Sequence, residues 1–329
     1  MKVKFKFLKW LWNALPPSFV IGSFTMLPDS IIKRLGPVSV TIEPTTACNF
    51  HCPLCPRTQI TRKHGSMSFD NYKKIIDTLP WTVRVIELYL MGEPLLAVDI
   101  FKMIRYAVDH GYHVRISSNA SYLEKFTNEV LNSGLTELVV AVDGATEETY
   151  KQYRIGGNFH DVIRGIKHFT DEKKKQGFTH PNVVLQFIVM KHNEHETEAI
   201  EKLSRDLGVD HLIFKRASLM DNTRNRAEQE KLKEKFLPRA ARFIRKSFIL
   251  GKIDPCRWAF GAMILQDGRM TSCCYDWDGK YQKGNTFDHG FKKIFQSREY
   301  TAMRKDIIGQ KLAICANCDY NTQVTERIF

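Results

Sequence analysis

Cys48-Asn49-Phe50-His51-Cys52-Pro53-Leu54-Cys55 holds three cysteines within eight residues and follows an apolar, strand-like stretch at residues 38–42. Three thiolates this close in sequence can converge on one soft metal centre. A four-iron cluster takes four thiolates, so three of them leave one iron with a vacant position. The spacing therefore predicts an iron–sulfur cluster whose open iron can bind a small molecule.

Zinc and disulfide bonds are the other uses that this spacing allows. Structural zinc takes four tetrahedral ligands, usually as two separated pairs, and His51 as the fourth ligand would strain the loop. Eight cysteines are an even number, which is compatible with disulfides. A chain of 329 residues without a secretory signal indicates instead a reducing cytosol, where thiols serve metals or redox chemistry. The pattern favours a cluster.

The composition is that of a soluble globular protein, with 43% hydrophobic and 26% charged residues. No run of about 18 apolar residues is present, so we expect no membrane-spanning helix and a cytoplasmic location. The formal net charge is +13, and deprotonated cluster ligands would lower it to roughly +10. This excess favours an anionic partner: a nucleotide, a phosphorylated sugar, an acidic peptide or a lipid head group. Without an RNP or GXXG motif, nucleic acid is not expected.

The first residues mix lysines with aromatic and aliphatic side chains. Phe5, Leu8, Trp12 and Leu15 fall at helical spacing, and Pro16-Pro17 ends the pattern. One interpretation is a helix that packs its aromatic rings on the main domain. The other is peripheral contact of residues 1–15 with an anionic membrane surface.

From residue 38 onward, six strand patterns alternate with helical patterns. Gly111, Gly134, Gly177 and Gly208 stand where four of the helices should end. Six β-α repeats predict a parallel sheet with right-handed connections, too few strands for a closed eight-stranded barrel. The expected strands are 38–42, 83–91, 113–117, 137–142, 183–190 and 211–214, and the expected helices are 69–78, 100–110, 124–133, 147–153, 159–174 and 194–207.

Polar motifs follow three of these strands, at the edge where parallel α/β proteins bind ligands. They are Gly92-Glu93-Pro94, Ser117-Ser118-Asn119 and Asp143-Gly144. The hydroxyl and amide groups of the second motif suit the hydroxyls of a sugar. Asp143 either faces a substrate or caps the following helix.

Together, the cysteine triad and these motifs resemble the radical S-adenosylmethionine (SAM) superfamily. The resemblance implies that Cys48, Cys52 and Cys55 hold a 4Fe–4S cluster on which SAM is cleaved to a hydrogen-abstracting 5′-deoxyadenosyl radical. A flavodoxin- or ferredoxin-like protein would supply the electron. Residues 92–94, with Glu93, would bind the methionine amino group, and Ser117, Ser118 and Asn119 the ribose. Leu54 stands where the family usually has an aromatic residue against adenine.

The other five cysteines lie near the C-terminus. The turn at residues 266–270 could bring Cys256 and Cys273 together, and Cys315 and Cys318 supply two more thiolates. Zinc would suit four such ligands, but their order resembles the SPASM/twitch domains of radical SAM enzymes and implies one auxiliary 4Fe–4S cluster. Cys274 is left over. It could replace Cys273 as a ligand, donate a hydrogen atom to a substrate radical, or be a small buried residue.

We therefore predict an α/β fold: a partial (β/α)6 TIM-like radical SAM barrel with a small cysteine-rich auxiliary-cluster domain. The expected segments are an N-terminal arm (1–36), the barrel (37–220), a basic helical connector (221–255) and the auxiliary domain (256–329). The expected reaction is two-electron oxidation of a small polar or carbohydrate-like substrate. The alternatives are peptide modification, epimerisation through Cys274 and, from another class, a zinc-stabilised binding protein without catalysis.

Overall fold

A computed structural model describes residues 31, 34–219, 226–243, 256–315, 318 and 325–329. The predicted membrane contact of residues 1–15 lies outside these residues, as do most of the N-terminal arm and part of the basic connector. No helix among the described residues is long and apolar enough to cross a membrane.

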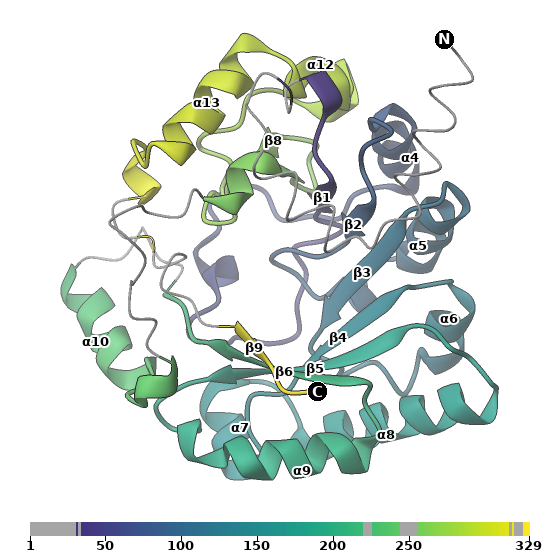
Figure 1. Ribbon diagram of the computed structural model, residues 1–329, viewed down its shortest axis with the longest axis vertical. Helices are drawn as coiled ribbons and strands as arrows, with labels where there is room; N and C mark the ends of the chain where they lie inside the picture. Colours follow the sequence, from purple (N-terminus) through teal and green to yellow (C-terminus); the bar gives the residue numbers. More distant parts are fainter. Residues whose placement is uncertain (1–30, 32–33, 220–225, 244–255, 316–317, 319–324) are drawn as a thin grey trace.

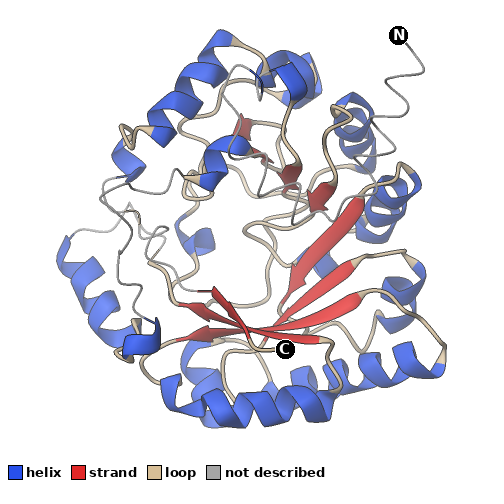
Figure 2. Cartoon of the chain, viewed as in Figure 1, coloured by secondary structure: helices blue, strands red, loops and turns tan. Residues whose placement is uncertain are grey.

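A single nine-stranded sheet organises the chain, in the order β8-β7-β1-β2-β3-β4-β5-β6-β9, and it curves without closing (Figures 1 and 2). The six predicted strands are its parallel centre and lie side by side in chain order, as expected for successive β-α units. Their bounds are β1 Ser39–Ile42, β2 Val85–Glu87, β3 His113–Ser118, β4 Glu137–Ala141, β5 Asn182–Val189 and β6 His211–Arg216.

The helices between these strands pack on the outer side of the curve, with α7, α8 and α9 below β4 to β6 in Figure 1. Gly111, Gly134, Gly177 and Gly208 all have φ between 71° and 82°, so the predicted helix-ending glycines are confirmed. The bounds are α4 Phe69–Thr78, α5 Ile100–Asp109, α6 Thr127–Asn132, α7 Glu147–Tyr153, α8 Phe159–Lys175 and α9 Thr197–Leu207, with the short helices η1 Pro56–Gln59, η2 Pro94–Leu96 and η3 Glu194–Glu196.

The second strand is much shorter than the predicted 83–91. β2 ends at Glu87, and the following residues turn toward Gly92 and Glu93. The helix predicted at 194–207 begins as η3 before α9. These are differences of boundary, because apolar pattern alone does not mark where a strand leaves the sheet.

The C-terminal residues add strands to both edges of the sheet. β7 (Ala262–Ile264) pairs in parallel with β1, β8 (Met270–Thr271) pairs with β7, and β9 (Thr325–Arg327) pairs antiparallel with β6. The predicted auxiliary domain is therefore continuous with the barrel sheet, and it covers two edges that would otherwise be open for pairing. Its helices are α11 Thr286–His289, α12 Phe291–Phe295 and α13 Arg298–Ile308, with η5 Arg257–Phe260 and η6 Ala313–Cys315; the connector contains α10 Arg226–Phe236 and η4 Ala241–Phe243.

The predicted turn at 266–270 is the hairpin between β7 and β8. Leu265 N–H donates to the Arg269 carbonyl over 2.9 Å, and Gly268 has φ 86°. A Cβ atom on Gly268 would lie 2.3 Å from Asn285 Oδ1. This position therefore excludes side chains by both backbone conformation and space.

A comparison of Gly111 with Gly268 separates the effect of backbone conformation from the effect of space. Both glycines have positive φ, but of the two only Gly268 is crowded. We expect Gly111→Ala to lower the free energy of unfolding by about 1 kcal/mol, the cost of a left-handed alanine. Gly268→Ala should cost distinctly more, since Asn285 must move as well. Denaturant unfolding of both variants measures the difference; equal losses would contradict the crowding at Gly268.

Candidate active site

The three N-terminal cysteines lie on the loop that leaves β1, called here the triad loop (residues 48–55). Cys52 is buried, and Cys48 and Cys55 are partly buried. The loop is tight: Cys55 N–H donates to the Cys52 carbonyl over 3.0 Å, and Phe50 N–H lies 3.4 Å from Cys48 Sγ. All eight cysteines of the chain are free thiols, so the disulfide framework considered above is wrong.

The electrostatics of the three thiols show that they lie near one another. Burial raises the pKa of Cys52 to about 11, and the neighbouring Cys55 and Cys48 add to the rise. Burial also raises the pKa of Cys48 and of Cys55. Within the described residues, no three Cys, His, Asp or Glu side chains surround a single point closely enough for one metal ion. Neutral, closely spaced, unpaired thiols on one loop fit a cluster that displaces their protons when it binds.

Gly92 and Glu93 support the beginning of this loop. A Cβ atom on Gly92 would lie 2.2 Å from the Thr45 carbonyl oxygen and 2.8 Å from that of Ala47. Glu93 N–H donates to the Ala47 carbonyl over 2.8 Å. The glycine is therefore needed for close approach to the backbone just before Cys48.

The Glu93 carboxylate is almost fully buried and binds the end of the third strand. It accepts hydrogen bonds from Ser118 Oγ and Asn119 N–H, each over 2.7 Å, and from Leu95 N–H over 3.1 Å. Its relative exposure is 2%. The structure thus joins two of the three predicted strand-end motifs through Glu93, with Pro94 opening the short helix η2.

Asn119 continues this connection to the triad loop. Its Nδ2 donates to Asn49 Oδ1 over 3.0 Å and lies 3.9 Å from Cys48 Sγ. Ser117 is half-buried and, in the part of the chain that the structure describes, makes no side-chain hydrogen bond. Leu54 is buried in the hydrophobic core at 7% exposure. The predicted roles of these residues toward SAM stay predictions.

Asp143 does not cap the helix that follows it, so that one of the two alternatives is wrong; contact with a substrate stays a prediction. Thr146 caps α7, its side chain accepting from Thr149 N–H. Asp143 is fully buried: Oδ1 accepts from Ile188 N–H over 2.7 Å, and Oδ2 lies 2.5 Å from the Arg154 guanidinium.

Arg154, which sequence reasoning missed, extends from the end of α7 toward the triad. Its Nη1 lies 3.9 Å from Cys52 Sγ. Burial acts to lower the pKa of Arg154, but Asp143 and Cys52 raise it above its usual value, so the guanidinium is a fixed positive charge beside the cysteines. The sequence offered one signal for the role of Arg154: it is a basic residue at the end of the helix that follows Asp143.

The residues after Arg154 pack on the triad loop. His51 N–H donates to the Ile155 carbonyl over 2.9 Å. Gly156 has φ 92°, and a Cβ atom on it would lie 3.0 Å from the Asn49 carbonyl oxygen; one on Gly157 would lie 2.6 Å from the Phe50 ring. Two glycines therefore let this segment lie against the loop that carries the cysteines.

The C-terminal cysteines also gather in one place. A hydrogen bond with Cys274 lowers the pKa of Cys273, and the same bond, burial and the nearby Cys256 and Cys318 raise that of Cys274. Burial, with a contribution from Cys273, raises the pKa of Cys315. The C-terminal thiols are therefore near enough to one another to perturb each other's ionisation, and Cys273 and Cys274 are in direct contact.

The fold is an open β/α barrel with one group of free thiols on the loop after β1 and a second group in its C-terminal part. A sequence model of the radical SAM superfamily matches residues 42–204, and one of the SPASM iron–sulfur cluster-binding domain matches residues 256–319. The chain belongs to the radical SAM superfamily and carries a C-terminal SPASM domain. Its cofactors are 4Fe–4S clusters and SAM.

Two relatives by sequence illustrate the range of the family. A probable GTP 3′,8-cyclase of Methanococcus maripaludis is 32% identical over 126 residues, 37% of this chain and 42% of that protein. The mycofactocin maturase MftC of Mycolicibacterium smegmatis is 23% identical over 310 residues, 87% of this chain and 76% of that protein. The match thus spans less than half the length of the first of these relatives.

Solved structures share the fold. BtrN in complex with AdoMet and 2-DOIA superposes with a TM-score of 0.55 at 16% identity, over 86% of this chain and 93% of BtrN. Streptococcus suis SuiB bound to S-adenosylmethionine superposes with a TM-score of 0.61 at 13% identity, over 88% of this chain and 72% of SuiB.

The buried Asp143–Arg154 pair leads to a test by double substitution. Asp143→Asn leaves the buried Arg154 charge unpaired and should destabilise the protein by about 3–5 kcal/mol. Adding Arg154→Met should restore most of this loss, because the uncompensated charge is removed. Denaturant unfolding measures both. Asp171→Asn, in the exposed pair with Lys167, is the control and should cost less than about 1 kcal/mol. Additive losses from Asp143→Asn and Arg154→Met would show that the pair is not coupled.

Proposed function

We propose that this protein is a radical SAM enzyme that oxidises a small, polar, anionic substrate by two electrons. Cys48, Cys52 and Cys55 would hold the SAM cluster, and Cys256, Cys273, Cys315 and Cys318 the auxiliary cluster. The observation that carries the proposal is the presence of two separate groups of free thiols, three on the triad loop and five in the C-terminal domain. When bound, the first cluster supplies the electron that cleaves SAM, and the second accepts the electron that the substrate loses with a proton after hydrogen abstraction.

Side chains on the inner face of the sheet support an anionic substrate. Lys215 pairs in register with Ile188, the residue whose N–H donates to Asp143. Burial raises the pKa of Asp143, whereas Arg154 and Lys215 lower it, so Lys215 lies near the buried pair. It is partly buried, and among the described residues it has no ion pair or hydrogen bond. A cation without an internal partner at the strand ends suits an anionic group of the substrate.

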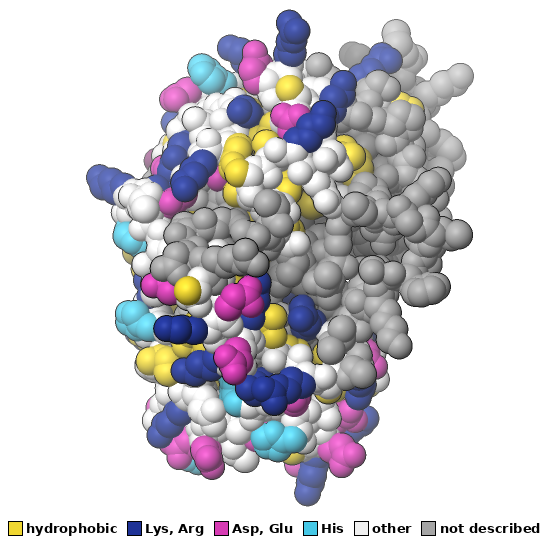
Figure 3. Space-filling view, turned by 90° about the vertical axis from the view of Figure 1, so that its left-hand side faces the viewer, with side chains coloured by type: hydrophobic (Ala, Val, Ile, Leu, Met, Phe, Trp, Pro, Cys, Tyr) yellow, Lys and Arg dark blue, Asp and Glu magenta, His cyan; other side chains and the backbone are white. Residues whose placement is uncertain are grey.

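Among the described residues on the face drawn in Figure 3, no basic patch competes with this site. On the face drawn in Figure 3, Lys and Arg side chains are interspersed with Asp and Glu side chains rather than gathered in one patch. Many are paired with each other in exposed i,i+3 and i,i+4 contacts. The net positive charge of the chain therefore does not by itself indicate a macromolecular partner.

A solved structure of the same fold supports a small substrate. The similarity to BtrN, whose structure contains 2-DOIA, covers 93% of that protein. An external one-electron donor of the flavodoxin or ferredoxin kind completes the proposed cycle.

Modification of a peptide is the second candidate. It is favoured by MftC, named as a maturase, whose similarity extends over 87% of this chain, and by a SuiB structure with its precursor peptide.

Anaerobic loading tests the proposed centres. The protein should carry roughly eight irons, as two four-iron clusters, and release 5′-deoxyadenosine from SAM under dithionite. Cys52→Ala should lose about half the iron and all cleavage of SAM. Cys315→Ala together with Cys318→Ala should lose the other half and retain cleavage of SAM. A colourless, zinc-containing protein would instead support the binding-protein alternative.

Isotope labelling then distinguishes the reaction types. With deuterated candidate substrates, small polyols or acids on one hand and peptides on the other, only the true class should transfer deuterium to 5′-deoxyadenosine. Oxidation gives a product with two hydrogens fewer. Epimerisation in D2O gives a product of unchanged formula with one solvent deuterium, and Cys274→Ser should abolish it. Incorporation that depends on Cys274 would contradict the proposed oxidation.

A further inference from the structure

The ends of the segment that carries the triad are tied together at its base. Thr46 N–H donates to the Gly65 carbonyl over 3.0 Å, and Met67 N–H donates to the Pro44 carbonyl over 2.9 Å. The Thr46 hydroxyl also accepts from Gly65 N–H over 3.0 Å. Residues 44–67 thus form one closed loop, with the cysteines in its first half.

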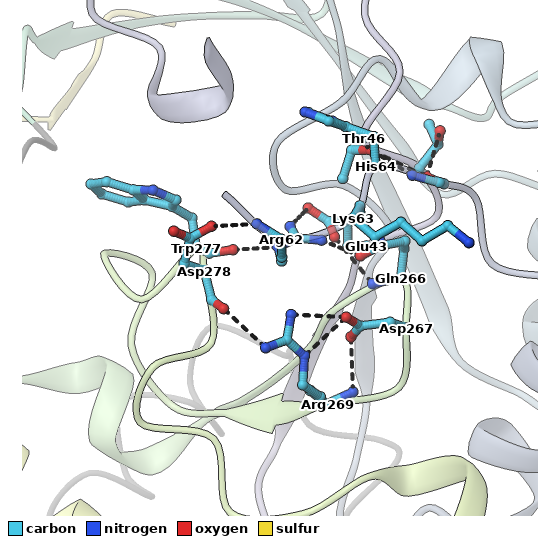
Figure 4. Close-up of polar contacts among 12 residues, drawn as sticks. Glu43, Thr46, Arg62, Lys63, His64, Gln266, Asp267, Arg269, Trp277 and Asp278 are labelled. Atoms are coloured by element: carbon cyan, nitrogen blue, oxygen red, sulfur yellow. Dashed lines mark hydrogen bonds and ion pairs between the residues drawn. The ribbon is translucent and has the colours of Figure 1, made fainter. Parts of the chain in front are cut away.

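A buried arginine lies at this base and binds three separate segments (Figure 4). Arg62 Nη2 donates to Glu43 Oε1 over 2.7 Å, at the end of β1. Its Nε donates to the Trp277 carbonyl over 2.6 Å, and its Nη1 donates to Gln266 Oε1. The side chains of Arg62 and Glu43 are 3% and 0% exposed. The planar guanidinium reaches these three acceptors from three separate nitrogen atoms, an arrangement that the single nitrogen of a lysine side chain cannot reproduce.

Asp278 joins the same base through backbone and hydroxyl groups. Its Oδ1 accepts from Thr61 N–H over 2.9 Å and from Arg62 N–H over 3.3 Å, and its Oδ2 accepts from the Thr61 hydroxyl over 2.7 Å. Gln266 N–H in turn donates to Glu43 Oε2 over 3.1 Å. We call these contacts of Glu43, Thr61, Arg62, Gln266, Trp277 and Asp278 the Arg62 network.

The C-terminal side of the network lies beside the second group of cysteines. Asp276 N–H donates to the Cys273 carbonyl over 3.0 Å, and the Asp276 carboxylate accepts from Thr271, Lys280 N–H and Tyr281 N–H over 2.7–3.0 Å. This turn fixes Trp277 and Asp278 relative to Cys273. Hydrogen bonds, together with the backbone of residues 276–278, therefore connect Cys273 to the base of the loop that carries the triad.

We propose that Arg62 is a positioning residue that makes SAM binding at the triad depend on loading of the C-terminal cluster. Ligation of the C-terminal thiols fixes the 273–278 turn, Trp277 and Asp278 hold Arg62 and Thr61, and the base of the triad loop is held as a result. Removing two charges from water is seldom stabilising in itself, which favours a role in geometry over one in stability.

SAM affinity of the anaerobically loaded protein tests this, read from the electron paramagnetic resonance spectrum of the reduced triad cluster during SAM titration. In the wild-type background, Cys315→Ser with Cys318→Ser should weaken SAM binding by about tenfold, a typical coupling between sites. Arg62→Lys keeps the positive charge but loses the forked guanidinium, so this variant alone should bind SAM more weakly than the wild type does. In the Arg62→Lys background, loss of the C-terminal cluster should weaken SAM binding by less than about a further twofold.

The matched control is Arg269→Lys. Arg269 contacts the same segment, donating to Asp267 over 2.9 Å and to the Asp278 carbonyl over 3.1 Å (Figure 4), but its described contacts do not reach residues 43–67. The tenfold effect should persist in this variant. The proposal would be overturned if loss of the C-terminal cluster weakened SAM binding equally in the wild-type and Arg62→Lys backgrounds. It would also be overturned if the tenfold effect of cluster loss disappeared in Arg269→Lys.

Thr61→Val is the milder variant, because it removes only the hydroxyl contact to Asp278. If Arg62→Lys does not load the triad cluster, Thr61→Val decides by the same titration: the effect of cluster loss should shrink, and an unchanged tenfold effect refutes the coupling.

Amide hydrogen exchange of residues 56–66 is a second readout, independent of SAM cleavage. Amide exchange of residues 56–66 should be faster when the wild-type protein loses the C-terminal cluster. It should also be faster in Arg62→Lys with both clusters loaded. An unchanged exchange rate in both cases would overturn the proposal.

Discussion

The triad loop depends on its surroundings for its shape, because it contains no helix or strand of its own. The strand-end motifs hold its beginning through Gly92, Glu93 and Asn119. The residues after α7 lie against its middle, and the Arg62 network holds its base. Metal ligands must be kept near their binding geometry by neighbouring groups if the site is to be selective. Here those neighbours come from the second, third and fourth strand ends and from the C-terminal residues.

Two arginines later in the chain than this loop help to hold it, and each is paired with a buried carboxylate. Arg154 pairs with Asp143, and Arg62 with Glu43. Because a thiolate-bound cluster is negatively charged, a fixed cation such as Arg154 beside Cys52 favours the deprotonated ligand. The pairs are better understood as devices that fix charge and direction than as sources of stability, since apolar residues of similar volume often stabilise at least as well.

The sequence predicted the six parallel strands, most helices and their terminal glycines, because apolar periodicity and glycine at helix ends arise from local geometry. It also identified the cysteines and the strand-end motifs that lie around them. It did not reveal that Glu93 binds Ser118 and Asn119, or that Asp143 binds Arg154, because such pairs depend on which side chains face each other in space. A helix cap was one of the two alternatives for Asp143, because aspartate is common at that position, but Thr146, three residues later, takes it. The edge strands β7 and β9 were missed because each has only three residues, too few to show a period.

The pairing of β7 with β1 has a consequence for synthesis of the protein. Val40 and its partner Ala262 are 222 residues apart in the chain (262 − 40), and β9 is made later still. While the barrel emerges from the ribosome, both of its sheet edges lack the strands that finally cover them, and unpaired edges are prone to associate with other chains. Contacts of such long sequence separation also form slowly. The nascent barrel therefore passes through a period with two open edges, and its safe folding in the cell depends on how quickly the last quarter of the chain arrives.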